Sequence, residues 1–111
     1  MVADDRGRFL VADTRGDAVL TFSADPLHRT ARYRLPGRPY GLAYDPVRQQ
    51  LWVTLTASNE VVALSTAGDR LTELARFPTV RQPNTVAVDP ASGRVFVAGR
   101  TTGQLQVLDR G

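Results

Sequence analysis

Arginine is the residue type in this chain that is best suited to binding a ligand. All 14 basic residues are arginines, and the formal net charge is +3. A guanidinium presents a planar fork of donors that suits the two oxygens of a carboxylate or a phosphate. The arginines are scattered, and no stripe of basic and aromatic residues accompanies them, so we expect no nucleic-acid surface. Two interpretations stay open: the arginines form anion sites, or they are solvent-exposed side chains that keep strands and turns soluble.

Other catalytic or ligating residues are absent or isolated. The chain has no cysteine, which excludes disulfides and thiolate metal sites. It contains no nucleophile–base–acid set, phosphate loop or histidine-rich metal spacing, so we predict no catalytic residue, metal or cofactor. His28, the only histidine, lies in a polar turn without a partner. An Arg-Gly-Asp tripeptide at residues 15–17 is interpreted as part of a hairpin turn, where Gly-Asp is common.

The elements that must position these residues recur along the sequence. Residues 39–55, PYGLAYDPVRQQLWVTL, match residues 83–99, PNTVAVDPASGRVFVAG, at an offset of 44. Upstream of residue 37 the offset is 42, and the difference of two residues falls in one loop. Insertions confined to a loop between matched segments are expected of a structural repeat. Asp45 and Asp89 recur in matched Asp-Pro turns, so we predict that each caps its own turn.

Each repeat unit is predicted to contain four short strands. The first strand ends at Asp-Pro, a pair that initiates turns. The middle strands are almost continuously apolar and rich in β-branched and aromatic residues, which predicts that both of their faces are covered. No segment keeps a helical period over three turns. Four antiparallel strands in every 40 to 45 residues are typical of a β-propeller blade.

The fold class predicted is therefore all-β, with eleven strands forming about 2.75 propeller blades of an incomplete ring. A single partial domain covers residues 1–111, with blade 1 at about 1–36, blade 2 at about 39–78 and blade 3 at about 83–111. Blade 3 lacks its outer strand. Trp52 and Phe96 are expected in second strands between blades. Because rings close with four to eight blades, the chain is either part of a longer propeller or completes a ring by self-association. A free wedge would leave two apolar blade faces in water.

The segments LWVTLTASNEVVALS and VFVAGRTTGQLQVLD resemble the YVTN-type propeller repeat. Residues 52–54 and 96–98 occupy its Tyr-Val-Thr positions, and Asn59 matches the asparagine before its third strand. Leu55 and Gly99 replace the motif asparagine. The resemblance covers almost the whole chain, and it implies seven blades in the complete protein and an exported or cell-envelope location. The residues themselves show no signal peptide order at MVADDRGRFL and no membrane span, and they leave the compartment open.

In a propeller, the loops that enter a blade and the loops between its second and third strands share one face, which we call the loop face. The first kind covers residues 37–40 and 80–84, and the second kind covers residues 14–17, 56–59 and 100–103. The candidate ligand-binding residues on the loop face are Arg15, Arg38, Tyr40, Arg81, Gln82, Asn84 and Arg100. Converging guanidiniums would suit a carboxylate or a phosphate. The alternative is that each arginine solvates its loop or pairs with a neighbouring aspartate.

The leading functional hypothesis is a non-enzymatic binding or scaffold module that uses the loop face. Its expected partners are a small anionic ligand or a protein, together with a second copy in a homodimer or the missing blades of a longer chain. The alternative is a fragment of a lactonase-like propeller hydrolase, because propeller relatives include lactone-hydrolysing enzymes with acidic residues around a channel metal. Only Asp17 and Glu60 are carboxylates expected near the channel, which favours the binding module.

Overall fold

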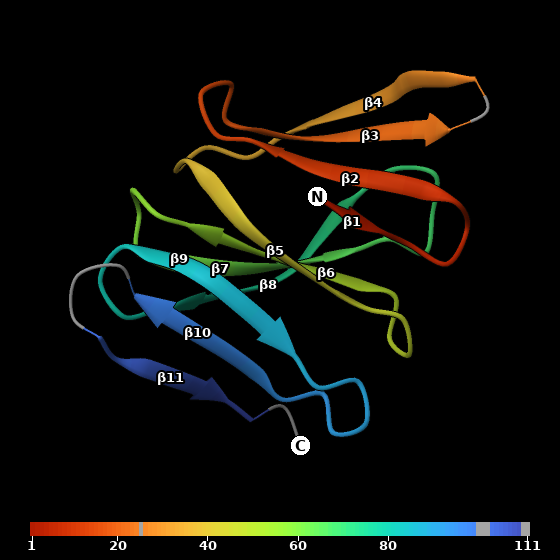
Figure 1. The fold of residues 1–111 in the computed structure, drawn as a ribbon. Helices are drawn as coiled ribbons and strands as arrows, with labels where there is room; N and C mark the ends of the chain where they lie inside the picture. Colours follow the sequence, from red (N-terminus) through yellow and green to blue (C-terminus); the bar gives the residue numbers. More distant parts are fainter. Residues whose placement is uncertain (25, 100–102, 110–111) are drawn as a thin grey trace.

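The computed structural model describes residues 1–24, 26–99 and 103–109, and every regular element in these ranges is a β-strand. Figure 1 shows three separate antiparallel sheets, with the sheet β5–β8 between the other two. The first sheet contains β1 (Val2–Ala3), β2 (Arg8–Asp13), β3 (Ala18–Ala24) and β4 (Leu27–Arg34). The second contains β5 (Pro39–Asp45), β6 (Gln50–Leu55), β7 (Glu60–Ser65) and β8 (Thr72–Pro78). The third contains β9 (Pro83–Val88), β10 (Val95–Gly99) and β11 (Leu105–Leu108).

Strand order within each sheet follows the order of the sequence, so each sheet is a simple meander. The predicted fold class is confirmed: the strands form propeller blades of an incomplete ring, and the last blade has three strands within the described ranges. The described residues form no helix, and hence none that could cross a membrane.

Aspartates hold the turns between the first and second strands of each sheet. Asp45 Oδ1 accepts hydrogen bonds from Val47 N at 2.9 Å and Arg48 N at 3.2 Å. Asp89 Oδ1 accepts one from Ala91 N at 3.2 Å. Aspartate is suited to this role because its short side chain reaches backbone donors two residues further along. Both aspartates therefore cap their own turns, as the repeat predicts.

The core consists of two apolar clusters, one on each side of the second sheet. On β6, Leu51 and Val53 face the first sheet, whereas Trp52 faces the third, because successive side chains of a strand point to opposite faces. Trp52 is 1% exposed and stacks on Phe77 with ring centroids 6.0 Å apart. This central position explains why the middle strands are almost continuously apolar.

Of the two aromatic residues expected between blades, only Trp52 lies there. Phe96 is in a second strand, β10, as predicted, but it is half-buried and lies on the side of the third sheet away from the second. The reason is the alternation along β10: Val95 and Val97 pack against the second sheet, so Phe96 points outward.

The first strands of the second and third sheets approach each other closely. A Cβ at Gly41 on β5 would lie 2.7 Å from the Asn84 carbonyl oxygen on β9, so only glycine fits this position. The buried Thr54 hydroxyl accepts a hydrogen bond from Gly41 N at 2.8 Å. The loops that precede β5 and β9 are thereby brought to the same end of the molecule.

Candidate functional site

Threonine side chains on the loop face join neighbouring sheets. Thr14 Oγ1 donates a hydrogen bond to the Pro39 carbonyl at 2.8 Å. Thr56 Oγ1 donates the same bond to the Pro83 carbonyl at 2.7 Å. Each bond runs from the hairpin loop of one sheet to the first strand of the next, so the repeat preserves an inter-sheet contact as well as a strand pattern.

A second repeated contact involves the last residue of each hairpin loop. Asp17 Oδ1 accepts a hydrogen bond from Arg38 N at 3.0 Å, and Asn59 Oδ1 accepts one from Gln82 N at 2.7 Å. All four residues have positive φ angles, between 49° and 62°. We call these two Asp/Asn-to-backbone contacts the clamp. Sequence reasoning did not identify the clamp, although TRGD and TASN at an offset of 42 carry its signal.

The structure brings two of the candidate arginines into one pocket. Arg15 and Arg38, with Thr14 and Asp17, line a shallow pocket of about 320 Å³ on the loop face. Both arginine side chains are exposed. Within the described ranges neither guanidinium has an ion pair or a hydrogen bond. The pair is therefore open to an external anion.

The other candidate residues within the described ranges do not line this pocket. Tyr40, Arg81 and Gln82 are exposed, and the backbone of Gln82 takes part in the clamp. Asn84 is half-buried, and its amide oxygen accepts a hydrogen bond from the Thr85 hydroxyl at 3.2 Å. Arg100 lies outside the described residues.

The two carboxylates expected near the channel are engaged in contacts within the chain. Asp17 belongs to the clamp, and Glu60 Oε1 accepts a hydrogen bond at 2.9 Å from Arg76 Nη1 on β8. Arg76 also pairs with Glu73 at 2.8 Å. In the described part of the chain, no three histidine or acidic side chains are grouped as metal ligands.

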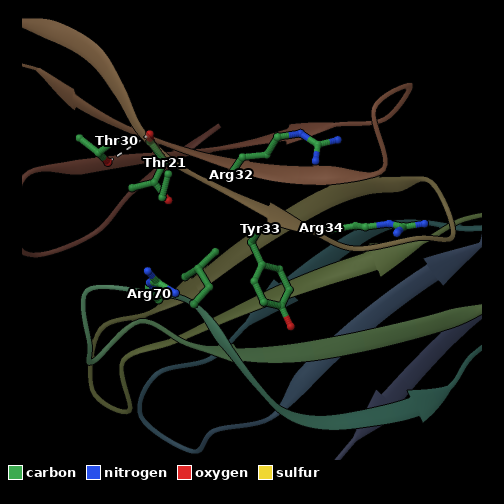
Figure 2. A pocket seen from close by; sticks show the side chains of 8 residues that line it. Thr21, Thr30, Arg32, Tyr33, Arg34 and Arg70 are labelled. Atoms are coloured by element: carbon green, nitrogen blue, oxygen red, sulfur yellow. Dashed lines mark hydrogen bonds between the residues drawn. The ribbon is translucent and has the colours of Figure 1, made fainter.

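A larger groove of about 500 Å³ lies between β4 and the connection from β7 to β8, and sequence reasoning did not anticipate it. Figure 2 shows Tyr33 pointing toward the second sheet, whereas the side chains of Arg32 and Arg34 run sideways, in a different direction from the Tyr33 ring. Burial raises the pKa of the Tyr33 phenol above its ordinary value, and the negative charge of Glu73 raises it further. Arg32 Nη2 donates to the Gly16 carbonyl at 2.7 Å. Arg32 and Arg34 line the groove from β4, whereas Arg70 lines it from the connection between β7 and β8.

The meander sheets and the contacts that join them define the fold as a partial β-propeller. No family model and no curated protein matches the sequence. Solved structures match its fold over nearly the whole chain. Hydrazine synthase of Kuenenia stuttgartiensis matches with a TM-score of 0.86 and 19% identity, over 99% of this chain and 31% of that one.

Two further matches come from proteins of different function. A chain of the mitotic checkpoint complex matches with a TM-score of 0.85 and 13% identity, over 97% of this chain and 34% of that one. A putative 6-phosphogluconolactonase from Bacteroides uniformis matches with a TM-score of 0.87 and 15% identity, over 99% of this chain and 36% of that one. The chain thus spans about a third of the length of these structures. At such identities the similarity establishes the fold alone.

Proposed function

We propose that this chain is a non-enzymatic binding module built from YVTN-like propeller repeats, which takes a small carboxylate- or phosphate-bearing ligand at its loop face. The observation that supports this most directly is the pocket between Arg15 and Arg38, whose guanidiniums have no partner among the described residues. Arginine forks favour planar anions of this kind. A protein partner with an acidic side chain at its surface would use the same chemistry.

The clamp supports this proposal because it fixes the backbone position of Arg38. Asp17 accepts the hydrogen bond from Arg38 N and lies in the same four-residue loop as Arg15. The backbones of Arg15 and Arg38 are therefore held close to each other, although both side chains are exposed. The Asp17 carboxylate also lines the pocket and offsets part of its positive charge. We accordingly expect weak, salt-sensitive binding, as is typical of exposed charges.

A lactonase-like hydrolase fragment is the second candidate. Its support is the similarity in fold to a putative 6-phosphogluconolactonase. Because Asp17 and Glu60 are occupied by contacts within the chain, a hydrolase would need acidic residues from blades beyond those described. Calcium would then raise the melting temperature of this chain if part of a metal site were present, because binding to the native state stabilises it. No calcium shift and no lactonase activity would favour the binding module.

The anion site can be tested by NMR titration with citrate and with inorganic phosphate. We expect the amide signals of residues 14–17 and 37–38 to shift together with a single dissociation constant. Arg15→Gln and Arg38→Gln should each weaken binding about two- to fivefold, the range for an exposed ion pair. Raising the salt concentration should weaken binding further.

Arg29→Gln is the matched control, because Arg29 is exposed on β4 and has no ion pair with the described residues. It should leave the dissociation constant unchanged. Arg81→Gln tests whether the site extends to the wider set of loop-face arginines. Shifts of equal size around Arg29, or an unchanged constant in both pocket variants, would contradict the proposed site.

A further inference from the structure

The two outermost sheet faces of this molecule are apolar over the second and third strands of their sheets, and Arg29 and Arg32 of β4 lie at the edge of the first. The first end face is the side of the first sheet away from the second, and the last end face is the corresponding side of the third sheet (Figure 1). Strand pairing defines their members. Phe9 is opposite Phe22 and Val11 opposite Leu20 on the first end face, and Phe96 is opposite Val107 and Ala98 opposite Leu105 on the last.

Each end face repeats a face that is buried inside the same molecule. At the offset of 42, the first end face corresponds to residues that pack against the first sheet: Leu51, Val53, Val62 and Leu64, all 0% exposed. At the offset of 44, the last end face corresponds to the buried residues Trp52, Thr54, Val61 and Ala63. The end faces have kept apolar side chains at every matched position, yet Leu105 is 64% and Val107 50% exposed.

The last end face also carries an aromatic ring, and the first an apolar groove. The last end face carries Phe96 at the position of Trp52, whose side chain inserts between the second and third sheets. The first end face has an apolar groove of about 340 Å³, lined by Met1, Phe9, Val11, Phe22 and Leu27. An aromatic ring on one end and an apolar groove on the other reproduce the pairing that holds the central sheet.

We infer that the last end face of one copy packs on the first end face of a second copy, in the way that adjacent sheets pack within one chain. Two copies placed head to tail make this contact twice and close a two-fold ring of six sheets, inside the range of closed propellers. The inference is independent of the anion site on the loop face.

The third sheet differs from the other two at the position that forms the clamp. Between covalently connected sheets, Asp17 and Asn59 accept a hydrogen bond from the connecting segment. The matched position in the third sheet is Gly103, which has a φ of 63° but no side-chain acceptor. The clamp cannot form there, so a second copy would pack on the last end face through its apolar side chains.

Light scattering on the purified full chain tests the inference. We expect a mass of twice 12.1 kDa at micromolar concentration. Val107→Asp on the last end face and Leu27→Asp on the first should each halve that mass, because each places a charge in an apolar contact. Leu74→Asp is the matched control: Leu74 is 52% exposed, against 50% for Val107, but lies on β8 outside both end faces. It should remain dimeric.

Mixing the two end-face variants tests the head-to-tail arrangement. A Val107→Asp copy keeps an intact first end face, and a Leu27→Asp copy keeps an intact last end face, so the mixture should recover a dimer through one intact contact. Circular dichroism should show unchanged strand content in all variants, since the substituted residues are exposed. A folded wild-type monomer, an aggregate, an open-ended assembly, or no recovery in the mixture would each overturn the inference.

Discussion

Among single residues, Asp4 shows most clearly how one carboxylate stabilises this fold. Its Oδ1 accepts hydrogen bonds from Arg6 N at 2.9 Å and Arg8 N at 2.8 Å, and its Oδ2 pairs with Arg8 Nε at 2.6 Å. Arg8 Nη2 donates in turn to the Thr66 carbonyl of the second sheet at 2.7 Å. Burial raises the pKa of Asp4, but the hydrogen bonds from Arg8 and Arg6 outweigh it and hold the pKa below its ordinary value. The ionised side chain therefore supports both a turn and a contact between sheets.

Asp4→Asn should lower the free energy of unfolding by about 1.5–3 kcal/mol at pH 7, the range for hydrogen bonds to a charged group. Because the folded-state pKa of Asp4 is lowered, its stabilisation is present above the unfolded-state pKa of about 3.9 and is lost as pH falls through the folded-state value. Urea denaturation at pH 7 and near pH 2 should show a smaller acid-induced loss in the variant than in the wild type. Asp69→Asn, at an exposed position without a hydrogen bond or ion pair to the described residues, should behave as the wild type. Equal acid sensitivity of Asp4→Asn and wild type would contradict this role.

At the scale of elements, strands were predictable and side-chain directions in loops were not. The 42- and 44-residue offsets located the strands and the Asp-Pro turns, because apolar periodicity and turn chemistry are local properties of sequence. Of the seven loop-face residues predicted from sequence, Arg15 and Arg38 line one pocket in the described part of the chain, and a shared ligand site for the set stays a prediction. Arg38 and Gln82 have positive φ angles that their residue types do not favour. The clamp imposes these angles through hydrogen bonds between residues 21 and 23 positions apart, which local patterns do not reveal.

Substitutions at Asn59 test the clamp, because the repeat itself supplies the comparison residues. Asn59→Asp should be nearly neutral, since Asp17 fills the same role in the first sheet. Asn59→Gly, the residue type at position 103, loses the acceptor but keeps the positive φ and should cost about 1 kcal/mol of unfolding free energy. Asn59→Ala also loses the acceptor and should cost about 2–3 kcal/mol, because alanine lacks both the freedom of glycine and the short polar side chain that lets asparagine adopt a positive φ, a strain of about 1–2 kcal/mol. Thermal and urea unfolding give this order, and an alanine variant no less stable than the glycine variant would show that the clamp does not act through backbone conformation.

At the scale of the whole molecule, stability depends on two separate interfaces around one central sheet. One apolar cluster joins the first and second sheets, and another joins the second and third. No buried residue belongs to both clusters among those described. Stacked repeats whose contacts are limited to neighbours lose stability locally when one interface is weakened. The two outer sheets should therefore be able to open independently while the central sheet stays paired with the other.

Two adjacent residues of β6 allow this independence to be measured. Trp52 faces the third sheet and Leu51 the first, and their side chains are 1% and 0% exposed. Trp52→Ala should cost about 3–5 kcal/mol and Leu51→Ala about 2–5 kcal/mol, the ranges for truncating buried side chains of these types. In amide hydrogen exchange, Trp52→Ala should accelerate exchange mainly in β9 to β11, and Leu51→Ala mainly in β1 to β4. Because the two residues are neighbours in one strand, general weakening of β6 would give the same exchange pattern in both variants. Only separate inter-sheet contacts produce opposite patterns, so identical profiles would mean that the three sheets unfold as one cooperative unit.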